Sequence, residues 1–114
     1  MQVRDDALSI RKLAREVRDP RGEGDAECLL GDVLQADGKL EAAHAAYAEY
    51  LAISRQLAEQ EPSNAGWQRE LAVAHGRVGN VLQAQGKLEA AQAAFAENLA
   101  ISRRLAEQEP SNAN

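Results

Sequence analysis

One stretch of this 114-residue chain is written twice, and this duplication limits the possible folds more than any other feature. Residues 31–65 recur as residues 79–113, a shift of 48 positions, with 29 of 35 residues identical. A fixed period of this size is typical of stacked-repeat proteins, in which each unit buries its apolar face against the next one. The chain is therefore predicted to contain two copies of one supersecondary unit.

Each copy has the pattern of two helices joined by a short turn. Apolar residues recur at the three- and four-residue spacing of a helical stripe, first before Gly38 and Gly86 and then after them. A glycine directly after such a stripe can take the left-handed conformation that ends a helix. The stripes are Leu71, Ala74, Val78 and Leu82 before Gly86, then Leu40, Ala43, Tyr47, Leu51, Ser54 and Leu57 in copy one, and Leu88, Ala91, Phe95, Leu99, Ser102 and Leu105 in copy two.

The boundaries follow from caps and prolines. We expect one domain over residues 1–114, with a capping helix in 1–20, a first repeat in 21–62 and a second repeat in 63–114. Each second helix has to end before the proline that closes its copy, because proline disfavours the helical conformation of the preceding residue. The expected helices are Ala26–Ala36 with Asp25 as N-cap, Lys39 to about Gln60, and Ala65 to about Gln85 with Asn64 or Ser63 as N-cap.

Glycines inside the expected first helices indicate a close helix contact. Gly79 and its counterpart Gly31 each cost about 0.5 to 1 kcal/mol relative to alanine, which suggests that the paired helix approaches them closely. For Gly76, contact with the paired helix and tolerance on an exposed face both remain open.

The repeat resembles the tetratricopeptide repeat. The matching residues are Leu30-Gly31-x2-Leu34, Ala43-x3-Tyr47 and Pro62 in copy one, and Val78-Gly79-x2-Leu82, Ala91-x3-Phe95 and Pro110 in copy two. Two departures are the residue ahead of the Leu-Gly pair, Glu27 or His75 instead of an aromatic, and a period 14 residues longer than usual. The resemblance implies an all-α fold of about five helices, in which antiparallel hairpins stack as a short right-handed solenoid.

The resemblance also implies a function without catalysis. In tetratricopeptide proteins the first helices of successive repeats line a concave groove that holds a segment of a partner protein. Here we expect a protein–protein interaction scaffold of this kind. The groove residues would be Asp32, Gln35, Arg69, Val73, Arg77, Asn80 and Gln83.

Two other uses of the chain stay open. The last repeat has no successor to cover it, so a homo-oligomer could form through Asn98, Leu99, Ile101 and Leu105, with Asn98 expected to face solvent. The basic residues Arg11, Arg15 and Arg18 could bind an anionic ligand, although a solvated helix face is the interpretation that we favour for them.

No catalytic or metal-binding pattern stands out. His44 and His75 lie in different copies without a second ligand at metal spacing, and the glycines do not form a phosphate loop. We therefore expect no enzyme activity, no cofactor and no metal. The net charge of −5 argues against nucleic acid as a ligand. The single Cys28 and the missing apolar run of about 18 residues lead us to expect a cytoplasmic protein without a membrane partner.

Overall fold

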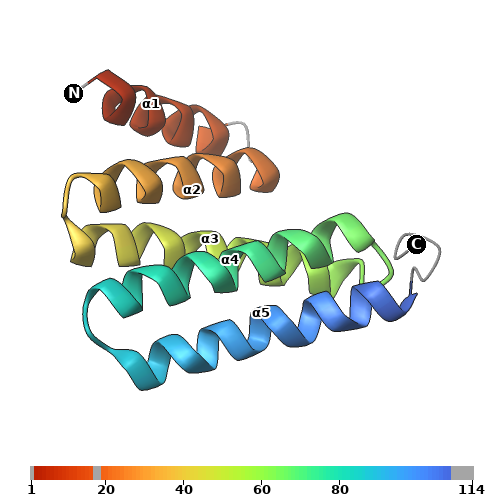
Figure 1. The fold of residues 1–114 in the computed structure, drawn as a ribbon. Helices are drawn as coiled ribbons and strands as arrows, with labels where there is room; N and C mark the ends of the chain where they lie inside the picture. The colour runs from red at the N-terminus through yellow and green to blue at the C-terminus, as the bar shows by residue number, and fades with distance from the viewer. Residues whose placement is uncertain (1, 17–18, 109–114) are drawn as a thin grey trace.

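The chain folds into five helices that pack in sequence order. The computed structural model describes residues 2–16 and 19–108 (Figure 1). The helices are α1 Gln2–Glu16, α2 Pro20–Ala36, α3 Leu40–Gln60, α4 Ala65–Ala84 and α5 Leu88–Gln108. Each helix packs against its neighbours in the chain, and the closest packing is within the pairs α2–α3 and α4–α5. The predicted all-α class and the two helix hairpins, α2–α3 and α4–α5, are confirmed.

The start of α2 differs from the sequence prediction. The helix begins at Pro20 instead of Ala26, and the backbone carbonyl of Asp19 accepts a 2.9 Å hydrogen bond from the Glu23 amide. Proline suits the first turn because its fixed φ is helical and its missing N–H would have no partner there. Asp25 consequently lies inside the helix and is not the N-cap.

The other helix ends follow the sequence. Gly38 and Gly86 have φ values of 78° and 80°, the left-handed conformation expected just after a helix. The side chain of Asn64 accepts a 3.1 Å hydrogen bond from the Trp67 amide and so caps α4. The turns at 37–39 and 85–87 therefore have the same geometry, and they reverse the chain in the same way in both hairpins.

A glycine facing an aromatic ring closes each hairpin. A Cβ on Gly79 would lie 2.6 Å from Cε1 of Phe95, and a Cβ on Gly31 would clash with the ring of Tyr47 in the same way. The predicted close contact of Gly31 and Gly79 with the paired helix is confirmed. Around these contacts lies a core made largely of leucine, valine and alanine: Leu30, Leu34, Ala43, Ala46, Tyr47, Val78, Val81, Leu82, Ala91 and Ala94.

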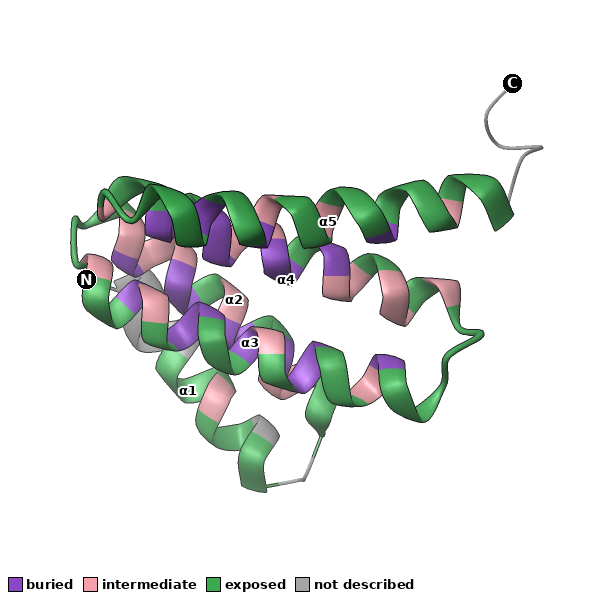
Figure 2. Ribbon diagram, turned by 90° about the horizontal axis from the view of Figure 1, so that it is seen from below, coloured by how far each residue is buried: buried purple, intermediate pink, exposed green. Residues whose placement is uncertain are grey.

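The packing stripe predicted for α5 is only partly buried. Ala91 is buried and Phe95 and Leu105 are half-buried, but Ser102 is exposed and Leu88 and Leu99 are 60% and 50% exposed. Figure 2 shows α5 exposed along most of its outer side. The reason is that no described helix covers α5 as α4 covers α3.

None of the described helices is both long enough and apolar enough to cross a membrane.

Candidate functional site

Side chains of the first helices of the two hairpins, α2 and α4, contact one another at two places. The guanidinium of Arg21 lies 5.7 Å from the centre of the Trp67 ring, and Nε of Arg77 lies 3.2 Å from Oδ1 of Asp32. Residue numbers rise together along both helices from one contact to the other, so α2 and α4 run in the same direction. We call these contacting surfaces the α2–α4 seam and treat them as the candidate site.

The middle of the seam is built around the hydroxyl of Tyr47. The Tyr47 hydroxyl donates a 2.5 Å hydrogen bond to Oδ1 of Asp32 and lies 3.2 Å from Oε1 of Gln35. Its single proton goes to Asp32, because a carboxylate is the stronger acceptor. Burial and this hydrogen bond both raise the pKa of Tyr47. Tyr47 thus stays a neutral donor that holds Asp32 in place at the seam.

Arg77 joins the two helices electrostatically. Its buried Nε is within ion-pair distance of Asp32 but makes no directed hydrogen bond, so the contact is a charge interaction. The pKa of Arg77 is raised, first by its polar interaction with the Cys28 side chain and also by the charge of Asp32. Burial is the main reason that the pKa of the Cys28 thiol is also raised. Cys28 is therefore a neutral thiol packed at the seam.

The structure divides the predicted groove residues into two groups. Asp32, Gln35 and Arg77 come together around Tyr47 and are half-buried. The remaining four are exposed on α4: Arg69, Val73, Asn80 and Gln83.

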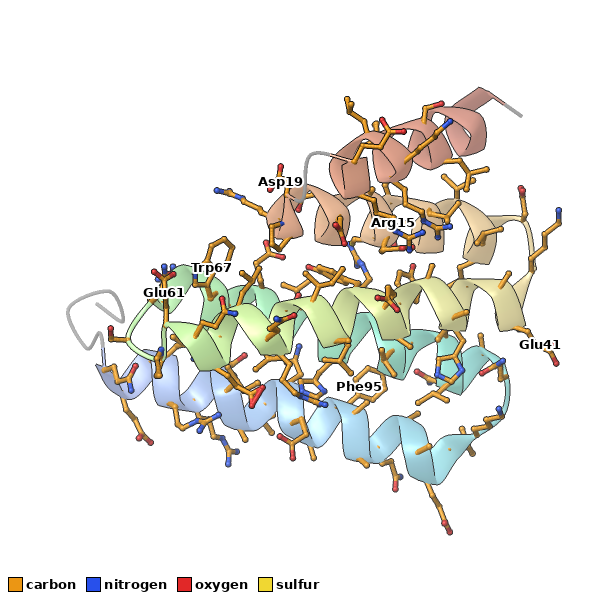
Figure 3. All side chains as sticks on the ribbon, turned by 180° about the vertical axis from the view of Figure 1, so that it is seen from behind. Arg15, Asp19, Glu41, Glu61, Trp67 and Phe95 are labelled. Atoms are coloured by element: carbon orange, nitrogen blue, oxygen red, sulfur yellow. The ribbon has the colours of Figure 1, made fainter. Side chains whose placement is uncertain are left out.

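Several seam residues escaped the sequence reasoning. Leu29 is 37% exposed on α2, next to Cys28. At the amino-terminal end of the seam, Arg21, Trp67 and Glu70 line a cleft of about 350 Å³ together with the predicted residue Arg69. Figure 3 shows Trp67 beside Glu61, whose carboxylate accepts a hydrogen bond from the indole N–H. If α2 had been predicted to begin at Pro20, Arg21 would have been placed inside the helix. It would then have been recognised as the helical counterpart of Arg69, 48 residues later.

A second charged cluster lies on the opposite side of α2. Glu27 is only 1% exposed, and its carboxylate accepts hydrogen bonds from Arg11 and, at 3.1 Å, from Arg15. Neither arginine is therefore a free anion site. Arg11 is half-buried, whereas Arg15 keeps an exposed side chain, as expected of a solvated helix face. Arg18 lies outside the described residues. The signal that was missed is that Glu27 lies on the same helical stripe as the core residues Leu30 and Leu34. A carboxylate there needs cationic partners, and Arg11 and Arg15, one helical turn apart, provide them.

The residues proposed for self-association also differ from expectation. Nδ2 of Asn98 donates a 2.7 Å hydrogen bond to the Ala72 carbonyl, so Asn98 points to α4 and not to solvent. Ile101 is buried and Leu105 half-buried, which leaves Leu99 as the exposed member of the four. The amide finds its partner inside the hairpin because an unsatisfied amide near the core would cost about 1 to 3 kcal/mol.

The fold defines a compact all-α domain of sequentially packed helices. A comparison of the chain with family models, with curated proteins and with solved structures gives no match.

Proposed function

We propose that the protein is a non-enzymatic interaction scaffold that binds a segment of a partner protein along the α2–α4 seam. The observation that carries the proposal is a pair of exposed apolar side chains beside the seam, Leu29 at 37% and Val73 at 42% exposure. Both stand on rigid helices next to charged and amide groups. This combination suits a peptide that offers apolar side chains and backbone hydrogen-bonding groups.

The likeness to tetratricopeptide repeats supports the same surface. In that family the first helices of successive repeats line the groove, and α2 and α4 are the first helices here. The parallel arrangement of α2 and α4 is what stacked hairpins require. A short right-handed solenoid with α2 and α4 on its concave side is part of this proposal.

The charges of the seam indicate the chemistry of the partner. Arg21 and Arg77 alternate with Asp25, Asp32 and Glu70. Burial, followed by the charge of Glu70, raises the pKa of Asp25. A surface of mixed sign favours a segment with few net charges over a polyanion, because like charges that face one another are repelled. We therefore propose a near-neutral partner segment with two apolar side chains, one beside Leu29 and one beside Val73.

A selection from short random linear peptides tests this function. Peptides selected on the whole protein should bind Val73→Glu about tenfold more weakly, because the new carboxylate disturbs an apolar contact. Ala93→Glu is the matched control, since it adds the same charge to an exposed position of α5. Equal affinity for Val73→Glu and the parent protein, or equal losses in both variants, would contradict the proposal.

A second candidate function is self-assembly through α5. It is favoured by Leu99, a leucine that is half exposed on the last described helix. Sedimentation equilibrium at rising concentration measures it directly. A mass that increases with concentration and returns to that of the monomer in Leu99→Glu supports self-assembly, whereas a monomer throughout the micromolar range rules it out.

A further inference from the structure

The second helices of the two hairpins, α3 and α5, have nearly the same sequence but differ in which of their residues are buried by a neighbouring helix. In α3, Ser54 and Ala58 are each 3% exposed, whereas their counterparts Ser102 and Ala106 in α5 are exposed. Likewise Leu51 packs against the core, whereas its counterpart is 50% exposed. We call these three α5 residues, Leu99, Ser102 and Ala106, the α5 stripe.

In α3 the same stripe is covered by α4. The side chain of Gln68 reaches the Ala58 carbonyl at 3.5 Å, and the Tyr50 hydroxyl donates a 2.5 Å hydrogen bond to Glu70. The packing of α4 on α3 thus shows how a helix can cover this stripe.

The covering face of α4 has a definite composition. Glu70 marks the side that faces α3, and Ala74 and Val81, which follow it at four and eleven residues, are fully buried. Small residues on both helices let the backbones approach closely: alanine and valine on α4, and serine and alanine on α3. The α5 stripe repeats the α3 residues, so its shape fits the same kind of helix.

One difference at the edge of the stripe changes what the partner needs. Tyr50 bonds to an acidic residue of the covering helix, whereas its counterpart Asn98 is turned to the Ala72 carbonyl of its own hairpin. A helix that covers α5 therefore needs the small apolar face of α4 but no carboxylate at the position of Glu70.

We propose that the α5 stripe binds an amphipathic helix of a partner polypeptide whose contacting face resembles Ala74 and Val81 of α4. A second copy of this chain is a poorer occupant, because its own α4 face is already covered by α3. This surface lies on the last described helix, apart from the α2–α4 seam, so the inference stands or falls independently of the function proposed for the seam. It competes with self-assembly for Leu99.

The test uses a fluorescent peptide of residues 63–86, which contains α4 with its caps, titrated with the whole protein and followed by anisotropy. We expect saturable binding that Ala106→Arg weakens at least about tenfold, since arginine in a small-residue seam cannot be packed. Ala93→Arg is the matched control, because it is exposed and lies about 140° around α5 from Ala106. A peptide with Ala74→Arg should bind as weakly as the stripe variant.

Three outcomes overturn the proposal. They are a lack of saturable binding, equal affinity for the two arginine variants, and a dimer that Ala106→Arg abolishes while no peptide binds. Circular dichroism melting curves of the variants separate lost binding from lost folding. Val73→Glu should leave peptide binding unchanged, which keeps failure here distinct from failure of the seam.

Discussion

The two hairpins of this protein, built from nearly the same sequence, solve one packing problem in two ways. In the first hairpin Tyr50 reaches outward to Glu70 on α4, while its ring lies 3.7 Å from the place where a Cβ on Gly24 would be. In the second hairpin the equivalent residue, Asn98, bonds inward to the Ala72 carbonyl. The next helix supplies the partner in the first case, and the hairpin itself supplies it in the second.

In each hairpin, the first helix has a glycine at the position where the side chain of Tyr50 or Asn98 needs space. Gly24 in the first hairpin corresponds to Ala72 in the second, and Gly76 in the second corresponds to Cys28 in the first. A Cβ on Gly76 would lie 3.0 Å from the amide nitrogen of Asn98, so the glycine makes room for the amide. Tyr50 is thus accommodated by Gly24 in the first hairpin. Asn98 is accommodated in the second hairpin by Gly76, which lies one helical turn after the counterpart of Gly24.

The hairpins also differ at a buried polar position. Glu27 is paired with two arginines of α1, whereas its counterpart His75 is 8% exposed and has its pKa lowered by burial and by the charge of Arg55. At the first site, α1 supplies the two opposite charges that pair with Glu27. The other is favoured in its neutral form.

The largest expected effect tests the feature that both hairpins share. Gly79→Leu should reduce the free energy of unfolding by about 3 kcal/mol, because even a Cβ would be 2.6 Å from the Phe95 ring. Chemical denaturation measures the loss, and Ala93→Leu on the exposed side of α5 is the control. Partial recovery in Gly79→Leu with Phe95→Ala would locate the clash, whereas an unchanged midpoint in the single variant would refute the contact.

Next in size is the charged site of the first hairpin. Glu27→Gln should cost about 2 kcal/mol, because a buried acceptor for two arginines loses its charge. Urea denaturation is the measurement, and Glu59→Gln, at an exposed position of α3, is the control. If both variants are equally stable, α1 is not held to α2 through this cluster.

A swap between hairpins tests the link between the glycine and its partner. Asn98→Tyr should destabilise the protein by about 1 to 2 kcal/mol, because Ala72 occupies the space that Gly24 leaves free for Tyr50. Adding Ala72→Gly should restore part of the loss, and a double-mutant cycle gives the coupling energy. Additive effects would mean that the glycine position and the side chain are independent.

The smallest effect concerns acid stability. Burial lowers the pKa of His75 below its usual 6.5, so near and below that pH the unfolded chain takes up more protons than the folded one. The histidine therefore contributes stability that is present at neutral pH and is lost as the pH falls through about 6.5. Melting temperatures between about pH 7.5 and 5.5 should decline less in His75→Gln, and equal slopes would contradict this assignment.

The sequence was sufficient for the features that depend on local chemistry. Gly38, Gly86 and Asn64 produce their caps from the backbone around them, and the close approach of Gly31 and Gly79 to the paired helix follows from the cost of a glycine inside a helix. The fold class and most of the packing stripes in α3 and α4 were predicted for the same reason. The start of α2 was missed because two glycines and a proline suggested a loop, whereas the proline fits the first helical turn.

What could not be predicted depends on neighbours. Identical stripes in α3 and α5 differ in burial only because α4 covers one of them. Likewise Arg11 looks solvent-facing until the axial position of Glu27 on α2 is known. For the candidate seam, the sequence predicted Asp32, Gln35 and Arg77 as groove residues, which stays a prediction, and it did not reveal that they lie around the Tyr47 hydroxyl.

The sequential packing of the helices has a consequence for how the molecule opens. Because each helix relies mainly on the ones before and after it, loss of α1 or α5 removes one interface and leaves the others intact. Amide hydrogens in α3, the middle one of the five described helices, should then exchange last, and those of α1 and α5 first. Local unfolding would then begin at α1 and α5 and reach α3 last.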